Sequence, residues 1–394
     1  MIGLIKPLQQ LRNRTPLGWL QLSHDKGRMV VAVAGIAFAD ILMFMQLGFQ
    51  NALYTSNTRL HTTLQTDLVL IHPQARNLIN LSSFPRRRLY QAMNVPGVKS
   101  ADSLYVKIAN WKNPETRRET SLMVVGFNPD RPAFALPEVN QNLSAIKLPD
   151  TVLFDRAARG EYQRTIAQIN QGTSVKTEIE RRTVSVSGLF TVGASFAADG
   201  ILMTSDQNYL RLFPRQNSGS VNAGLIQLQP GADPVQVQQV LTAYLPDDVK
   251  VLTKQEFIDF EKNYWAKNTA VGFVFNLGVA MGFVVGVIIV YQVLSTDVSD
   301  HMGEYATFKA MGYRNVYLLG IVFEEALILS IIGFLPGLGI SFGLYALTRK
   351  ATNLPLYMTL VRAVTVLILN VVMCSISGTI ATRKLQAADP ADMF

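Results

Sequence analysis

The chain has 394 residues, of which 49% are hydrophobic and only 16% are charged, and its mean hydropathy is +0.20. Soluble domains carry about 25% charged residues, so this composition excludes a chain built only of soluble domains. The formal net charge of +8 could indicate nucleic-acid binding, but with this hydropathy it favours a membrane protein with basic cytoplasmic flanks and no nucleic-acid partner.

Four long apolar stretches predict transmembrane helices, because about 20 such residues cross the hydrocarbon core of a lipid bilayer. Ionisable side chains are absent from three of them, 268–296, 326–348 and 363–382, and Asp40 alone interrupts the first. We expect the helices at 29–50, 270–294, 316–347 and 359–381. The first stretch is too long for a signal peptide and no small-x-small cleavage site follows it, so we expect it to remain as an anchor.

Basic residues in front of the first span predict the orientation. Residues 1–28, an amphipathic segment, contain one acid, Asp25, and five basic residues, Lys6, Arg12, Arg14, Lys26 and Arg28. Such a bias places the N-terminus in the cytoplasm. Four crossings then put 51–268 outside, 295–315 inside, and the tail 382–394 back in the cytoplasm.

The region 51–268 alternates between strand-like and helix-like patterns. Strand-like runs occur at 67–72, 121–127, 183–190, 224–229 and 250–252, and amphipathic helix patterns at 85–94 and 233–244. The second helix should begin with Asp233 as N-cap and Pro234 at its first position. We therefore expect an α+β extracytoplasmic domain with a β-rich insertion at about 145–220. The chain's one cysteine, Cys374, excludes an intramolecular disulfide.

The sequence carries no catalytic signature. It contains neither a G-x-S-x-G elbow, nor H-E-x-x-H, nor a G-x-x-x-x-G-K-[ST] loop, and its four histidines are scattered. We expect no catalytic residue, no metal site and no cofactor bound by this chain. Three consecutive arginines, Arg86, Arg87 and Arg88, open a predicted surface helix, where we expect them to be solvated rather than to bind phosphate.

Small residues follow one face of the second and third spans. Gly278, Gly282 and Gly286 are spaced at i, i+4 and i+8, and Gly333 and Gly337 continue the pattern in the next span. This spacing lets helix backbones approach closely, either within one chain or at a homodimer seam. Four spans are too few to enclose a transport path, which favours a dimer.

Acids also occur inside the predicted spans. A carboxylate near the bilayer centre costs about 2.5–3.5 kcal/mol, so Asp40, Glu324 and Glu325 each need a partner, water or a proton. A proton relay or a substrate contact is one interpretation. Structural acids that face other helices are the interpretation we favour.

The segment 295–315 between the second and third spans is the most informative. Residues 298–311 can form a short amphipathic helix that ends at Gly312. Its pattern resembles the coupling segment of MacB/FtsX-type ABC transporter permeases, which docks into the ATPase. The residues that carry this resemblance are Glu304, Ala306, Lys309, Met311, Gly312 and Tyr313, followed by Arg314. One departure is the pair Asp297 and Asp300, where MacB proteins often carry arginines.

Other segments extend the resemblance along the chain. The order of one span, a large external domain and three more spans is MacB-like, and Glu325-Ala326-Leu327 with Gly333 and Gly337 resembles the family's third span. The residues 388–392 resemble its D-P-A tail. The segment 19–49 is most similar to the cyanobacterial DevC branch.

The resemblance implies an α-helical membrane protein with four transmembrane helices plus a large α+β extracytoplasmic domain, of the mechanotransmission type. It implies a homodimeric permease in the bacterial inner membrane with a separate ABC ATPase subunit, which would hold ATP and Mg. A periplasmic adaptor and a TolC-like outer-membrane protein would carry glycolipid or other hydrophobic cargo onward.

Within the coupling segment, Glu304 would pair with a basic residue of the ATPase and Met311 would fill an apolar pocket. Lys309 and Arg314 would bind lipid phosphates. The alternative is an FtsX-like regulatory membrane protein that controls a periplasmic hydrolase, although its external domain is usually smaller. A membrane enzyme lacks support, because no catalytic constellation is present.

Overall fold

A computed structural model describes residues 17–387, which form two compact units. The helical unit contains 17–50, 274–347 and 356–387, and the sheet unit contains 51–273 and 348–355. Three basic residues that set the predicted orientation, Lys6, Arg12 and Arg14, and the D-P-A tail lie outside the described residues.

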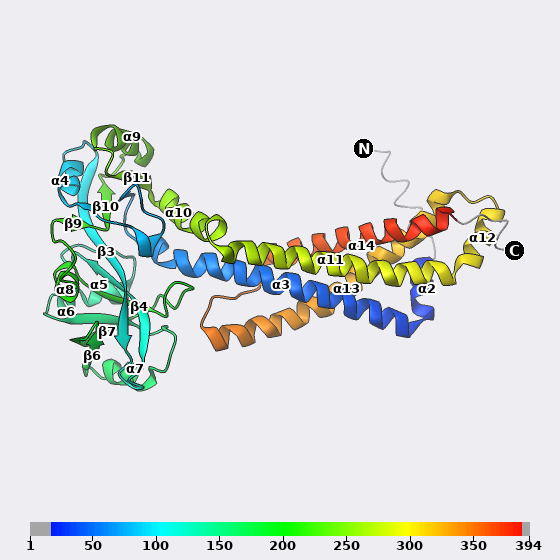
Figure 1. Cartoon of the computed structure of the whole chain (residues 1–394), viewed down its shortest axis with the longest axis horizontal. Helices are drawn as coiled ribbons and strands as arrows, with labels where there is room; N and C mark the ends of the chain where they lie inside the picture. Colours follow the sequence, from blue (N-terminus) through cyan, green and yellow to red (C-terminus); the bar gives the residue numbers. More distant parts are fainter. Residues whose placement is uncertain (1–16, 388–394) are drawn as a thin grey trace. The chain divides into compact units, whose positions relative to one another are not determined.

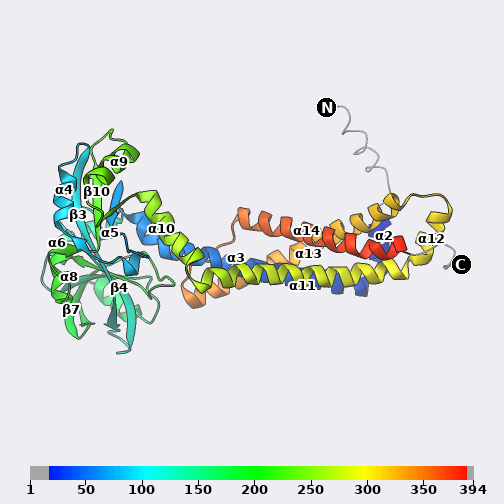
Figure 2. The same ribbon diagram turned by 45° about the horizontal axis from the view of Figure 1, so that its top comes forward.

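The helical unit is built on four long helices that lie side by side (Figures 1 and 2). They are α3 (Lys26–Thr63), α11 (Ala270–Asp300), α13 (Asn315–Thr352) and α14 (Leu360–Ala387), with the short helices α2 (Leu17–His24) and α12 (Met302–Ala310). The first three contain the predicted spans 29–50, 270–294 and 316–347, and α14 begins one residue after the predicted start of the span 359–381. Each of the four is long and apolar enough to cross a membrane. Helix α13 continues without a break through Pro336.

The sheet unit contains one nine-stranded sheet in the order β11-β1-β10-β3-β4-β8-β5-β7-β6. Its strands are β1 (Leu68–Ile71), β3 (Val98–Lys112), β4 (Glu119–Phe127), β5 (Thr151–Asp155), β6 (Val175–Ile179), β7 (Arg182–Phe190), β8 (Ile201–Ser205), β10 (Ala223–Leu228) and β11 (Lys250–Thr253). A separate ribbon pairs β2 (Phe84–Pro85) with β9 (Ser220–Val221).

Short helices connect these strands (Figure 1). They are η1 (Leu78–Asn80), α4 (Arg87–Met93), α5 (Pro137–Gln141), α6 (Leu143–Ile146), α7 (Gln163–Asn170), α8 (Asp206–Leu212), α9 (Pro234–Tyr244) and α10 (Lys254–Lys267). Helix α9 begins as predicted, because the Asp233 side chain accepts a hydrogen bond from the Val235 amide and Pro234 follows it.

Strand β3 joins the two halves of the sheet. It pairs along one edge with β4, and along the other edge with β10 as far as Leu104 and with β6 from Trp111 onward. The segment 145–220, where we expect a β-rich insertion, contains β5, β6, β7 and β8 together with α7 and α8, and these four strands continue the same sheet.

Both faces of the sheet are buried. Along β1, Leu68 and Leu70 join a core with Tyr105 and Trp111, whereas Val69 and Ile71 join a second core on the opposite face. Side chains alternate between the faces of a strand, so a strand covered on both faces becomes a continuous apolar run. This explains why the five predicted strand runs coincide with β1, β4, β7, β10 and β11.

The arginine run is more ordered than predicted. The Arg88 guanidinium is buried and donates from Nε and Nη2 to the Asp248 carboxylate, at 2.7–3.0 Å, and these hydrogen bonds lower the pKa of Asp248. Arg86 lies 3.5 Å from Asp206. Of the three arginines, only Arg87 is exposed as expected. Arg88 lies on the buried face of α4.

A carboxyl group is buried on α10. Glu261 is 1% exposed, and its two oxygens accept hydrogen bonds from the Trp265 indole (2.8 Å) and the Leu78 amide (2.7 Å). The His61 Nε2 atom lies 3.7 Å from Oε2. Burial raises the pKa of Glu261 from 4.5 to about 7, although both hydrogen bonds oppose this shift.

Glu261 and His61 should have opposite effects on the pH dependence of stability. Folding favours the protonated Glu261 carboxyl, so its contribution is complete below pH 4.5 and is lost as the pH rises to about 7. Burial lowers the pKa of His61 from 6.5 to about 3, so folding favours its neutral form and stability falls as the pH drops below 6.5. Because Glu261→Gln removes only the first effect, we expect its stability relative to the wild type to rise by up to about 3 kcal/mol between pH 4.5 and 7. Denaturant unfolding followed by tryptophan fluorescence measures this difference, and a difference that does not change with pH would contradict the assignment.

Candidate functional site

The loop between α11 and α13 folds into a defined structure. Helix α12 ends at Gly312, which has a φ of +90°. The Gly312 amide donates to the Lys309 carbonyl (3.0 Å) and the Tyr313 amide to the Phe308 carbonyl (3.1 Å), while the Phe308 and Tyr313 rings lie 5.7 Å apart. These two bonds and this contact are the Schellman motif, in which glycine adopts the left-handed conformation without a Cβ penalty. The predicted end at Gly312 is confirmed.

One face of α12 is buried against its neighbours. Tyr305 and Ala306 are each 1% exposed, and Tyr305 packs with Val298 of α11 and with Leu318 and Val322 of α13. Ala306 therefore supports the position of α12 and does not present a side chain for docking. The ring of Tyr317 lies 4.7 Å from that of Tyr313, which extends this packing to the turn.

The opposite face of α12 is open. Glu304, Thr307 and Met311 follow one another at i, i+3 and i+7 and are exposed, with 61% of Met311 accessible. Tyr313 and Arg314 are exposed beside them, and Lys309 is half-buried. We call Glu304, Thr307 and Met311 the outer face of α12. It combines a carboxylate with a large apolar side chain, as an interface for another protein requires.

An ion-pair cluster fixes the end of the bundle where α12 lies. The Arg28 guanidinium of α3 lies 2.5 Å from Asp300, 3.6 Å from Asp297 and 3.5 Å from Asp25. His301 lies 3.5 Å from Asp297, which is 3% exposed. The two acids that depart from the MacB pattern are thus used inside the chain. Sequence reasoning missed this cluster because its members lie 272 positions apart.

The acids within the spans occupy different environments. Asp40 is buried, and its Oδ2 accepts a hydrogen bond from Asn370 Nδ2 (2.8 Å), which also donates to the Ser330 carbonyl (3.1 Å). This arrangement links α3, α13 and α14. Glu325 is fully buried beside Asp297, whereas Glu324 is partly exposed. The pattern is that of acids facing helices, and the neighbours Glu324 and Glu325 do not share one environment.

The predicted packing glycines all face α3. A Cβ added at Gly278, Gly282, Gly286, Gly333 or Gly337 would lie no more than 3.2 Å from an atom of α3. The α3 residues that they meet are Gln46, Met43, Ala39, Ile36 and Asp40. Packing within the chain therefore uses this face, and a homodimer seam would need another surface.

The described residues offer no group of three or more His, Cys, Asp or Glu that could hold a metal ion. The site consists instead of a rigidly closed loop with one free face, next to a cluster that fixes α3 against α11. Such a site can bind a protein partner and pass on a displacement.

Comparisons with known proteins concern two parts of the chain. Residues 276–390 match the family model described as FtsX-like permease C-terminal. This match supports the permease resemblance for the loop and for most of α11, α13 and α14. No curated protein matches the sequence.

Two solved structures are similar to about half of the chain. The periplasmic region of MacB from Actinobacillus actinomycetemcomitans is 7% identical, with a TM-score of 0.35, and covers 51% of this chain and 94% of its own. The extracellular domain of the noncanonic ABC-type transporter YknZ from Gram-positive bacteria is 15% identical, with a TM-score of 0.30, and covers 48% and 100%.

Two glycines of α13 allow a matched test of the packing. A Cβ at Gly337 would meet Asp40 and the Ala37 backbone, whereas a Cβ at Gly339 meets nothing within 4 Å. We expect Gly337→Val to destabilise the bundle by about 1–3 kcal/mol through overpacking, and Gly339→Val to have little effect. Thermal unfolding of the purified variants in detergent measures the difference. Equal losses at both positions would show that α3 does not pack there.

Proposed function

We propose that this chain is the permease subunit of an ATP-binding cassette transporter and that ATP is hydrolysed by a separate subunit. The observation that carries the proposal is the family match over residues 276–390, which includes the whole α12 loop. The outer face of α12 supports it, because it leaves a carboxylate and an apolar side chain free for a partner. The permease itself performs no chemistry.

The four long helices span the bacterial inner membrane in this proposal, with both termini and α12 in the cytoplasm. The apolar stretches and the basic residues of 1–28 support that orientation. The sheet unit then lies in the periplasm, where it would engage an adaptor and a TolC-like outer-membrane protein.

Coupling depends on a stiff connection from the ATPase to α3 and α11. Tyr305 fixes α12 against α13, and Arg28 fixes α3 against the end of α11. A displacement of α12 by the ATPase is therefore passed to α11 and α3 together. Both helices extend into the sheet unit in the sequence, since α3 ends at Thr63 and α11 follows α10. Glycolipid or other hydrophobic molecules are the cargo that the DevC-type resemblance implies.

An FtsX-like regulatory protein is the alternative, in which the same coupling would control a periplasmic hydrolase without moving cargo. The family match supports both, because its description is FtsX-like. The sheet unit of 51–273 is large for that role. Accumulation of cargo in a deletion strain would favour export, whereas uncontrolled cell-wall hydrolysis would favour regulation.

The dimer that this function requires would form through α11. This helix is the least covered of the four. Of its most apolar stretch of 18 residues, 17% is buried inside the chain, whereas the share in the other three helices is 33–50%. Its exposed residues Leu277, Met281, Val284 and Ile288 are spaced by four, three and four, which is the spacing of a coiled-coil seam. They lie apart from the glycine face, which α3 occupies.

We expect Glu304→Ala and Met311→Asp to weaken ATPase docking. Loss of a charge pair at an interface costs about 2–5 kcal/mol, which would abolish stimulation of the ATPase and export. Membrane insertion should stay normal, because neither side chain supports the bundle. Thr296→Ala is the control, since its exposed hydroxyl bonds only within α11. ATPase assays of the purified complex test this; wild-type coupling in both variants would reduce α12 to a connecting loop.

Cysteines on the α11 seam should trap a dimer. We expect Met281→Cys and Ile288→Cys to cross-link across the two-fold axis in membranes, since isologous contacts bring equivalent residues together. Phe342→Cys on α13 is an equally exposed control that should remain monomeric on gels. The native Cys374 is buried and does not compete. Cross-linking of Phe342→Cys alone would place the interface on α13 instead.

A further inference from the structure

A cavity of about 590 Å³ opens in the sheet unit beside an uncovered stretch of β3. No strand in the described part of the chain pairs with this edge of β3 between Leu104 and Trp111. Two side chains bond to the edge instead: Asn222 Oδ1 accepts from the Val106 amide (3.1 Å) and Glu180 Oε1 from the Asn110 amide (3.0 Å). These two bonds occupy part of the edge, and the cavity lies beside it.

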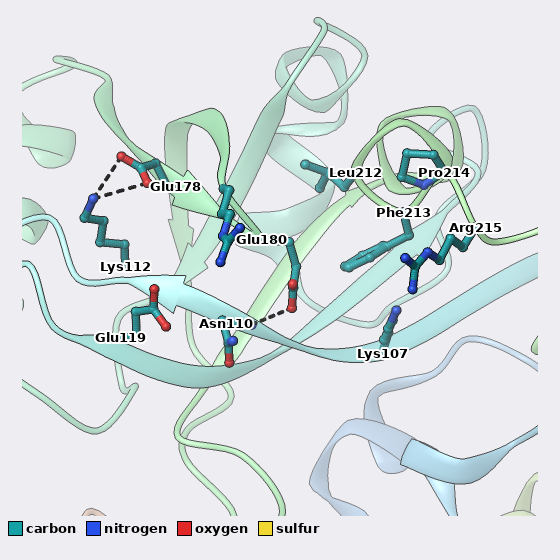
Figure 3. Close-up of a pocket in the computed structure, with 11 residues that line it drawn as sticks. Lys107, Asn110, Lys112, Glu119, Glu178, Glu180, Leu212, Phe213, Pro214 and Arg215 are labelled. Atoms are coloured by element: carbon teal, nitrogen blue, oxygen red, sulfur yellow. Dashed lines mark hydrogen bonds and ion pairs between the residues drawn. The ribbon is translucent and has the colours of Figure 1, made fainter.

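Cations without acidic partners line this cavity. Lys107, Arg181 and Arg215 are exposed there, and none forms an ion pair within residues 17–387. In contrast, Lys112 pairs with Glu178 at 3.1 Å. Lys107, Phe213 and Arg215 lie together at one end of the cavity, whereas Lys112, Glu119 and Glu178 lie at the other (Figure 3). Glu180, which accepts a hydrogen bond from the Asn110 amide, lies between the two ends, and the charged groups beside Phe213 are Lys107 and Arg215 (Figure 3).

An ordered apolar wall adjoins these cations. The Phe213 ring packs 4.7 Å from Tyr209, which stacks on Tyr105 at 5.1 Å, and Lys107 Nζ lies 4.8 Å from the Phe213 ring centroid. The Gln216 amide donates to the Phe213 carbonyl (2.9 Å) and closes a turn that contains Arg215. The Phe213 ring and the turn that contains Arg215 are thus ordered before any ligand binds.

Arg181, the third of these cations, lies in a strained turn. Glu180 and Arg181 form the two-residue connection between β6 and β7, with φ values of +46° and +67°. Turns of this type favour Asn-Gly, because other side chains are strained at positive φ. Glu180 uses its position to bond to β3, as its amide donates to the Asn110 carbonyl (3.0 Å). Arg181 makes no such contact, and strain of this kind is typical of functional positions.

We propose that this cavity binds a small anion. Its phosphate or carboxylate group lies at Lys107 and Arg215, and Arg181 adds positive charge to the lining of the cavity. The volume is in the range of about 300–1,000 Å³ that small-molecule sites occupy. Charge-assisted hydrogen bonds from arginine hold the anion. A soluble organic phosphate and a lipid headgroup share this chemistry, and the site goes beyond the proposed permease function.

Isothermal titration of the full chain in phosphatidylcholine nanodiscs tests the proposal. Phenyl phosphate is the soluble probe, dihexanoylphosphatidic acid the lipid probe and benzyl alcohol the uncharged control. We expect one site per chain, with affinity for the anions reduced roughly tenfold in Arg215→Ala and in Arg181→Gly. Lys99→Ala, an exposed lysine on β3 outside the cavity, should bind as the wild type does. Tighter binding of one probe identifies the source of the ligand.

The unfolding temperature of Arg181→Gly shows whether Arg181 acts in binding or supports the folded structure. Glycine fits the conformation of Arg181, so Arg181→Gly should unfold at a higher temperature than the wild type while it binds more weakly. The proposal is overturned if neither anion binds at up to about 10 mM. It is also overturned if benzyl alcohol binds equally well, if Lys99→Ala loses as much affinity as Arg215→Ala, or if Arg181→Gly is less stable than the wild type.

Discussion

Close approach of α11 and α13 to α3 is the contact on which the helical unit depends. Five glycines on those two helices meet five α3 residues, from Ile36 to Gln46, and a Cβ at any of them would lie 2.4–3.2 Å from the nearest α3 atom. In a membrane, where we propose that these helices lie, there is little hydrophobic gain from burying one apolar helix against another, so close van der Waals packing would supply the association. Helix α3 is consequently the element that α11, α13 and the loop between them are arranged around.

Polar pairs between helices then fix the helix positions that close packing at the glycines allows. Asp40 and Asn370 join α3 to α14 in the interior, and Arg28 joins α3 to the last turn of α11 through Asp300. An unpartnered charge in such a place would be costly, so each pair specifies which helices are neighbours. The same cluster uses Asp297 and Asp300 internally, which leaves the outer face of α12 as the free polar surface of this loop.

In the sheet unit, the constraint is that the long central strand β3 has to pair with strands of both halves of one sheet. β3 changes partner from β10 to β6, and the interval between them is closed by Asn222 and Glu180 instead of a strand. The cavity with Lys107 and Phe213 lies at this interval. A gap in strand pairing thus coincides with the unpaired cations Lys107, Arg181 and Arg215.

The sequence by itself determined the features that follow from local chemistry: the four apolar helices, the strands buried on both faces, the Asp233 cap and the end of α12 at Gly312. Each depends on residues within a few positions of one another. Only the tertiary structure decided which glycine face meets α3, that Ala306 points inward, that Arg88 reaches Asp248, and that β3 joins the two halves into one sheet. Those contacts join residues far apart in the chain, and no local pattern encodes which distant partner a side chain will meet.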